Sequence, residues 1–138
     1  VSTTRTSAKI TKLNKGTYYK YTAVAYKTTT EGQKVIASSK TIHVETIGGK
    51  VGNYKKVKLN KKKVKLKSGK IFKIEAEQLP ETKKLKVKRH RGICFESSNS
   101  SIATVSSSGK VKAKKKGTCV IYIYSQSGTF SKMTVRVK

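Results

Sequence analysis

Apolar and polar residues alternate along most of this chain, which is the pattern of β-strands that bury one face. The clearest runs are TCVIYIYS (118–125) and FSKMTVRVK (130–138), in which apolar residues recur at every second position and QSGT forms the connection. The three- and four-residue spacing of an amphipathic helix is nearly absent. Gly, Ser and Asn clusters separate the runs at intervals of roughly ten residues, as in antiparallel sandwiches. The pattern therefore predicts an all-β fold.

The other predicted strands are shorter, and turn residues separate them. Three glycines within IGGKVGN (47–53) interrupt the alternation and predict a domain boundary. Pro80 ends the strand that is predicted at 70–79. The runs predicted as strands are 8–13, 17–27, 34–46, 56–60, 63–67, 70–79, 83–97 and two short strands within 102–113.

Parity along each run predicts which side chains are buried. Near the C-terminus the predicted core residues are Ile102, Val105, Val111, Ala113, Cys119, Ile121 and Ile123. Near the N-terminus, Tyr19, Tyr21, Ala23 and Ala25 share the predicted inner face. The predicted outward tyrosines are Tyr18, Tyr26, Tyr122 and Tyr124. These four can stack on bases or sugars, or they can form cross-strand pairs that stabilise a sheet.

The charge of the chain is extreme, because 33 Lys and Arg residues stand against 6 Asp and Glu residues, for a net charge of +27. Such a field attracts polyanions without specificity. Nearly all of the cations are lysines, whereas arginine is the residue that reads guanine and clamps phosphate bidentately. The composition therefore indicates that nucleic acid is bound only non-specifically, if at all.

Two short segments, KVKRHR (86–91) and KAKKK (112–116), are the densest basic patches. The candidate polyanion contacts in them are Lys86, Lys88, Arg89, Arg91, Lys112, Lys114, Lys115 and Lys116. The alternative interpretation is a solvated strand face, in which lysines keep exposed strand edges from pairing with other chains.

No catalytic or metal-binding pattern is visible. Cys94 and Cys119 would permit one disulfide, but parity places them on opposite faces and predicts two separate thiols. Neither cysteine has the close-spaced partner of a zinc site, and His43 and His90 have no carboxylate and nucleophile in a catalytic pattern. The chain has no apolar run of about 18 residues that could span a membrane. We therefore predict no enzyme activity, no cofactor and no metal.

Residues 95–125, FESSNSSIATVSSSGKVKAKKKGTCVIYIYS, resemble the bacterial immunoglobulin-like domain of group 2. Phe95 stands at the position of an aromatic residue that is usually Trp in that family. The positions that match in order are Ser97, Ser98, Asn99, Ile102, Ala103, Thr104, Val105, Gly109, Val111, Gly117 and Thr118. The resemblance extends over about residues 55–138 and implies an immunoglobulin-like β-sandwich of the kind found in bacterial surface and secreted proteins.

The first third of the chain resembles the C-terminal half of a fibronectin type III domain. LNKGTYY (13–19) fits the corner motif of that family through Leu13, Gly16 and Tyr19, and the corner tyrosine would cap a neighbouring loop through its hydroxyl. The predicted organisation is a partial fibronectin type III-like set of strands at 1–47, a linker at 48–54 and the immunoglobulin-like domain at 55–138.

These resemblances imply a non-catalytic module of a larger secreted or cell-surface bacterial protein. The chain opens within a pattern and without Met, which suggests a piece of a longer protein. Its expected role is that of a spacer or adhesion module that contacts anionic cell-wall polymer, carbohydrate or a host surface protein. The alternative is a β domain that binds polyanions or nucleic acid.

Overall fold

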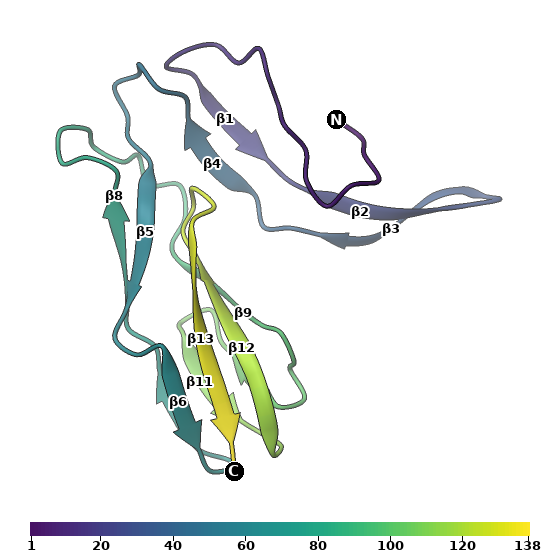
Figure 1. Ribbon diagram of the computed structural model, residues 1–138, viewed down its shortest axis with the longest axis vertical. Coiled ribbons are helices and arrows are strands. Elements are labelled where there is room, and N and C mark those ends of the chain that lie inside the picture. The colour runs from purple at the N-terminus through teal and green to yellow at the C-terminus, as the bar shows by residue number, and fades with distance from the viewer.

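The computed structural model describes all 138 residues as strands and loops, without a helix (Figure 1). No helix that could cross a membrane is therefore present. The first part of the chain forms two strand pairs, β1 with β4 and β2 with β3. Their bounds are β1 Tyr18–Tyr21, β2 Val24–Thr29, β3 Gly32–Ser38 and β4 Ile42–Glu45.

The second part forms an immunoglobulin-like sandwich, which confirms the predicted all-β fold. One sheet has the order β6-β13-β12-β9, a second has the order β10-β11-β7, and β5 pairs with β8 beside them. The bounds are β5 Tyr54–Leu59, β6 Lys63–Leu66, β7 Ile71–Lys73, β8 Ala76–Pro80, β9 Cys94–Ser97, β10 Ala103–Val105, β11 Lys110–Ala113, β12 Gly117–Tyr124 and β13 Phe130–Val137.

The core lies between these sheets and follows the predicted alternation. Antiparallel pairing places Cys119 opposite Val135 and Ile121 opposite Met133, all facing inward. The predicted residues Val111, Ala113, Cys119, Ile121 and Ile123 are buried, and Ile102 and Val105 pack half-buried against them. Since every buried strand residue has an outward neighbour, the lysines between them face solvent.

The matched motif residues meet in three dimensions. Gly109 adopts a φ of +79° in the turn between β10 and β11, where its N–H donates to the Ser106 carbonyl at 2.9 Å. A Cβ at Gly109 would lie 2.9 Å from Cζ of Phe95. Glycine is therefore needed twice, for a left-handed backbone and for the close approach of the aromatic ring.

Several predicted strands are wrong in extent. Residues 8–13 form no strand and leave Ile10 43% exposed, because no neighbouring strand pairs with them. The run 83–97 is strand only at β9, and before it the chain forms a loop with one bridge, between Val51 and Lys86. Leu85 and Val87 alternate with lysines in that loop, but the only backbone pairing that they meet is the bridge to Val51, so the alternation does not become a strand.

The run 70–79 is also not one strand. It divides into β7, which pairs with β11, and β8, which pairs with β5. At the break Ile74 enters the core, and the backbones of Asn60 and Glu75 are hydrogen-bonded at 3.0 Å. The chain thus changes partner strands within one alternating run, which sequence parity could not show.

The predicted burial of Ala23 and Ala25 is wrong. Figure 1 shows the β2–β3 hairpin extending away from the rest of the molecule, and all of its residues are exposed. The predicted corner contact is present, since the Tyr19 hydroxyl accepts a hydrogen bond of 3.0 Å from the Asn14 N–H. The fibronectin type III-like identity of this part stays a prediction.

The two parts meet at a joint formed by Tyr18, His43, His90, Arg91 and Gln126. The β12–β13 loop reaches toward β4, where the Gln126 carbonyl accepts a hydrogen bond of 2.7 Å from the His43 N–H (Figure 1). The buried Gln126 side chain accepts from the His90 N–H at 2.8 Å and donates to the Lys88 carbonyl at 2.7 Å. The backbone carbonyl, the Oε1 and the Nε2 of Gln126 thus all have hydrogen-bond partners, and these bonds hold the loop in one conformation.

Two histidines that lie far apart in sequence stack at this joint. The rings of His43 and His90 are nearly parallel with centroids 5.0 Å apart, and the Tyr18 ring lies 4.6 Å from His90 and 6.0 Å from His43. Tyr18 is therefore not the exposed outward residue that parity predicted, and burial raises the pKa of its hydroxyl. Burial lowers the pKa of His43 below its ordinary value of 6.5, and the charges of His90, Lys20 and Arg91 lower it further.

The linker region is also held in place. Asn53 bonds to Glu45 twice, since its Oδ1 accepts from the Glu45 N–H at 2.9 Å and its Nδ2 donates to the Glu45 carbonyl at 2.8 Å. The next residue, Tyr54, donates its N–H to the Ser127 hydroxyl at 3.1 Å. The connection between the two parts is thus clamped from both sides.

The first prediction concerns the core. Ile121→Ala should lower the free energy of unfolding by about 2–5 kcal/mol, because Ile121 is fully buried and truncation leaves a cavity. Urea unfolding measures this difference. Thr118→Ala, at an exposed position of the same strand, is the control and should change stability by no more than about 0.5 kcal/mol. Equal losses in the two variants would contradict the assigned register.

The second prediction concerns pH. Because the pKa of His43 is lower in the folded chain, the unfolded chain takes up the proton first as pH falls below 6.5. The stability of the joint should therefore decrease as pH falls through this window. Hydrogen exchange of the His43 amide, compared at about pH 7 and about pH 5 after correction for intrinsic rates, measures it. In His43→Gln the difference should disappear, and an unchanged difference would show that another group is responsible.

Candidate polyanion-binding surface and pocket

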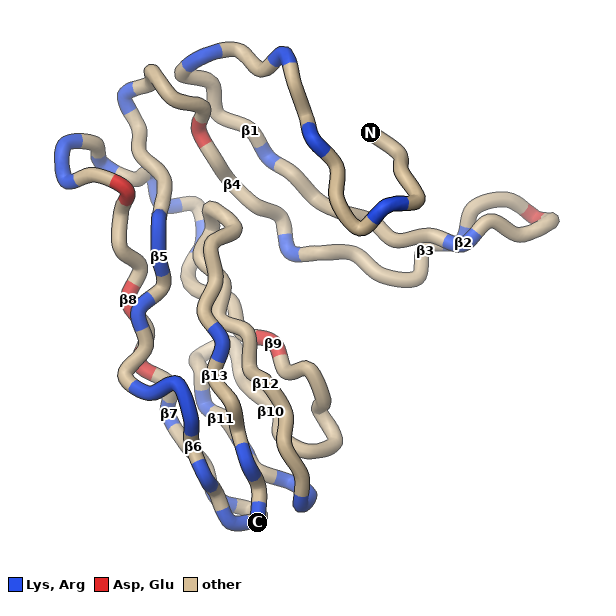
Figure 2. The backbone as a smooth tube through the Cα atoms, viewed as in Figure 1, with Lys and Arg blue, Asp and Glu red and all other residues tan.

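The two basic patches predicted from the sequence lie at different places in the fold. Residues 86–91 lie in the loop before β9, beside the joint, whereas residues 112–116 lie at the end of β11 and in the turn to β12, near the C-terminus (Figure 2). The structure therefore does not bring the eight candidate residues together into one surface.

Arg91 differs from its neighbours because its guanidinium is engaged within the chain. Its Nε donates to the Thr41 carbonyl at 3.2 Å, and its Nη2 donates to the Ser125 carbonyl at 2.9 Å. Its Nη1 lies 2.9 Å from the Sγ of Cys94. Arg91 thus connects the first part of the chain to the β12–β13 loop, while Lys86, Lys88 and Arg89 remain exposed.

In the fold, lysines from two other segments, which the sequence analysis missed, lie beside the second patch. The turn after β6 lies against the turn after β11, where the Gly69 N–H donates to the Ala113 carbonyl at 2.9 Å and the Ser68 hydroxyl bonds to the Lys114 carbonyl. The Lys138 N–H donates to the Leu66 carbonyl at 2.9 Å. Together these segments form a basic tip whose members are all exposed: Lys67, Lys70, Lys114, Lys115, Lys116 and Lys138.

The basic tip is electrostatically uncompensated. The six acidic residues are Glu31, Glu45, Glu75, Glu77, Glu81 and Glu96, and Figure 2 shows none of them at this end. Lysine carries a strongly hydrated point charge on a flexible stem, so the tip suits a flexible polyanion better than a single rigid anion. Sequence reasoning missed Lys67, Lys70 and Lys138 because they come from segments distant from 112–116.

The outer face of the four-stranded sheet carries an aromatic cluster. Tyr122 and Tyr124 lie next to Phe130, with ring centroids 6.2 and 5.7 Å from it, and Lys132 lies 5.5 Å from the Tyr122 ring. Burial and the nearby charge of Glu96 raise the pKa of Tyr124. These contacts are the cross-strand pairs that stabilise a sheet.

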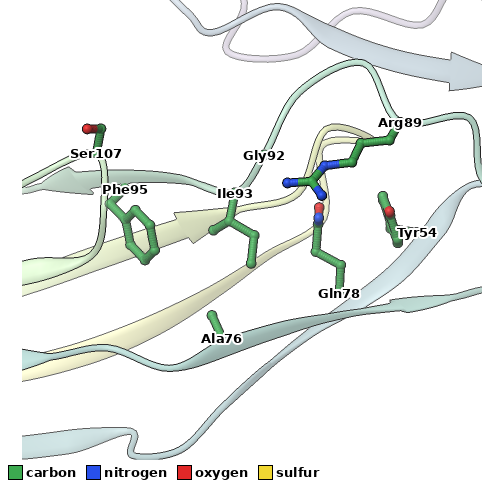
Figure 3. A pocket seen from close by; sticks show the side chains of 8 residues that line it. All are labelled: Tyr54, Ala76, Gln78, Arg89, Gly92, Ile93, Phe95 and Ser107. Carbon is green, nitrogen blue, oxygen red and sulfur yellow. The ribbon is translucent and has the colours of Figure 1, made fainter.

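A pocket of about 480 Å³ lies between β8 and the segment that leads into β9 (Figure 3). Its walls combine apolar and aromatic side chains with a few polar groups. The residues that line it are Tyr54, Ala76, Gln78, Arg89, Gly92, Ile93, Phe95 and Ser107. Of these, only Arg89 was a candidate from the sequence, because the others come from segments that the fold alone brings together.

The cysteines lie as parity predicted. Cys119 is buried in the core, whereas Cys94 pairs with Tyr124 and faces the other side of the sheet, and the two thiols are free. No group of three or more His, Cys, Asp or Glu side chains is arranged to hold a metal ion.

Comparison with known proteins agrees with this architecture. The family model of the bacterial Ig-like domain (group 2) matches residues 53–135. No curated protein matches the chain. Among solved structures, the crystal structure of domains 4 and 5 of the S-layer protein SbsC is similar, with a TM-score of 0.53 and 18% sequence identity over 94% of this chain and 81% of that one.

The family match covers more than half of the chain and includes the residues from Phe95 to Thr118 on which the resemblance was based. The resemblance predicted from those residues is thereby confirmed: the chain belongs to the bacterial Ig-like (group 2) family.

Proposed function

We propose that this chain is a non-catalytic surface module of a larger secreted bacterial protein, in which it acts as a stiff spacer that is retained on an anionic envelope polymer. Its family and its likeness to domains of an S-layer protein support a place at the cell surface. The observation that carries the retention is the basic tip, where six exposed lysines from three segments converge without an acidic side chain.

The joint supports the role of a spacer. Two packed parts behave as one stiff unit only when specific contacts fix their relative orientation. Here the Arg91 side chain donates to the Thr41 carbonyl, and the Gln126 backbone carbonyl accepts from the His43 N–H, so that both bonds cross between the two parts. The Asn53 side chain bonds to the Glu45 backbone beside the connection. Such contacts hold a fixed angle without a large apolar interface.

The charge supports retention through electrostatics. Exposed cations attract a polyanion over about one Debye length, which is about 8 Å at physiological salt, so binding should weaken steeply as salt rises. Single-stranded nucleic acid offers the same phosphate charge and would be held non-specifically by the same lysines.

The third prediction concerns stiffness. Arg91→Ala removes the hydrogen bond that crosses between the two parts to the Thr41 carbonyl, and it also removes the bond to the Ser125 carbonyl. Each carbonyl loses this donor, which costs about 1–3 kcal/mol for each group. We expect the two parts to reorient independently, with ¹⁵N relaxation giving separate correlation times for 18–45 and 55–137. Ser100→Ala, at an exposed loop position, is the control and should tumble as the wild type does. Unchanged rigid tumbling of Arg91→Ala would contradict the role of the joint.

The fourth prediction concerns retention. The variant Lys114→Gln, Lys115→Gln, Lys116→Gln should bind purified anionic wall polymer at least about tenfold more weakly at about 0.15 M salt, where exposed charges act only at short range. The matched control, Lys27→Gln, Lys34→Gln, Lys40→Gln, removes the same charge from the distant β2–β3 region. Sedimentation with polymer-bearing cell wall across a salt series measures both.

Three outcomes would contradict this mechanism. Equal losses in the two triple variants would mean that net charge matters and the basic tip does not. Binding that is independent of salt would reject electrostatic retention. Stronger binding to single-stranded DNA than to wall polymer at the same salt would favour the nucleic-acid alternative.

A further inference from the structure

The pocket beside β8 and β9 has the composition of a ligand site. Tyr54, Ala76, Ile93 and Phe95 supply apolar and aromatic walls, while Gln78, Ser107 and Arg89 supply polar groups. Figure 3 shows the guanidinium of Arg89 and the amide of Gln78 directed into the same space between these walls. Ligand pockets typically combine such apolar surfaces with a few converging polar groups.

Arg89 is the only cation that lines the pocket, and its guanidinium makes no hydrogen bond within the chain. The contrast with Arg91 is direct, since Arg91 donates to three backbone carbonyls of this chain. A planar guanidinium matches a carboxylate, which can accept two parallel hydrogen bonds from it. Lys86 and Lys88 from the same exposed loop add to the positive potential around it.

Gln78 adds a second polar group without a partner. Its Oε1 is buried and has no hydrogen-bond partner, so a ligand in the pocket does not reach this atom. The Nε2 of the same amide is the group that can donate to an oxygen atom of a ligand. The pocket therefore offers two donors, the Arg89 guanidinium and the Gln78 amide, beside its apolar walls.

A carboxylated sugar suits this lining. Its carboxylate accepts from Arg89, its hydroxyl oxygens accept from the Gln78 amide and exchange hydrogen bonds with Ser107, and the apolar face of its ring packs on Tyr54 and Phe95. A peptide C-terminus offers the carboxylate without a ring of hydroxyls. The chemistry of the lining therefore favours the sugar.

We propose that this pocket binds an acidic sugar unit, a pyranose that bears a carboxylate, with Arg89 holding the carboxylate. The inference rests on the proposed function, because such units would belong to the anionic polymer on which the chain is retained. The basic tip then provides non-specific attraction, and the pocket provides recognition of one chemical group.

The experiment is a ¹⁵N NMR titration of the full chain at about 0.15 M salt, which screens diffuse attraction. The probes are D-glucuronate, D-glucose, acetate and triglycine. Glucuronate should shift the amides of Gly92, Ile93 and Ser107, and it should do so at lower concentration than the other three probes. Arg89→Gln should raise the glucuronate Kd about tenfold or more, since hydrogen bonds to charged groups are the stronger ones.

Two further variants test whether the planar guanidinium and the position of the charge matter. Arg89→Lys retains the charge without the planar fork and should weaken binding by less than Arg89→Gln does. Lys116→Gln removes one charge at the basic tip and should leave glucuronate binding unchanged. Because Arg89 and Lys116 are both exposed, these variants should fold as the wild type does.

Each contrary outcome overturns either the pocket proposal or the proposed function. Equal shifts with glucose would show that the carboxylate is not read, and equal shifts with acetate or triglycine would show that the sugar ring is not read. If no probe shifts the pocket amides while wall polymer is still retained through the basic tip, the pocket proposal fails and the proposed function stands. If glucuronate binds the pocket but the tip variants retain polymer normally, the electrostatic retention fails instead.

Discussion

The antiparallel pairing of β12 with β13 is the interaction on which the rest of this structure depends. It runs over eight residue pairs, from Gly117 opposite Val137 to Tyr124 opposite Phe130, and a short loop closes it. Closing so short a loop costs little chain entropy, so the hairpin can form early and locally. Its free edges then accept β9 on one side and β6, in parallel, on the other. The same hairpin places the buried Gln126 at its loop, where the joint forms.

The charge distribution follows from this arrangement. Because strand residues alternate between faces, each apolar residue of the core implies an outward neighbour, and in this chain that neighbour is commonly lysine. Exposed like charges repel only weakly in water, so the sandwich tolerates them. The tip is the place where turns from separate strands end together, and there the tolerated charge becomes a concentrated positive surface. Arginines play a different part: Arg91 is a structural donor to carbonyls, and Arg89 faces the pocket.

Sequence parity was accurate where one strand keeps one partner. It placed Ile121 and Ile123 in the core and Cys94 and Cys119 on opposite faces, as the structure shows. It failed for 70–79, where the chain changes partners at Ile74, and for Ala23 and Ala25, where a hairpin has no sheet to cover. Alternation reports that a residue can face a core, but whether a core is present depends on other segments. The pocket and the joint were beyond sequence reasoning for the same reason.

The sequence by itself therefore determined the fold class, the family and the faces of the strands in the sandwich, because these follow from short-range alternation and from glycines such as Gly109 that a turn requires. The tertiary structure alone decided that His43 stacks on His90, that Arg91 is bonded internally while Arg89 is free, and that Lys67, Lys70 and Lys138 join the lysines of 114–116. These are contacts between segments far apart in the chain. Their geometry depends on how the sheets pack, which no local pattern specifies.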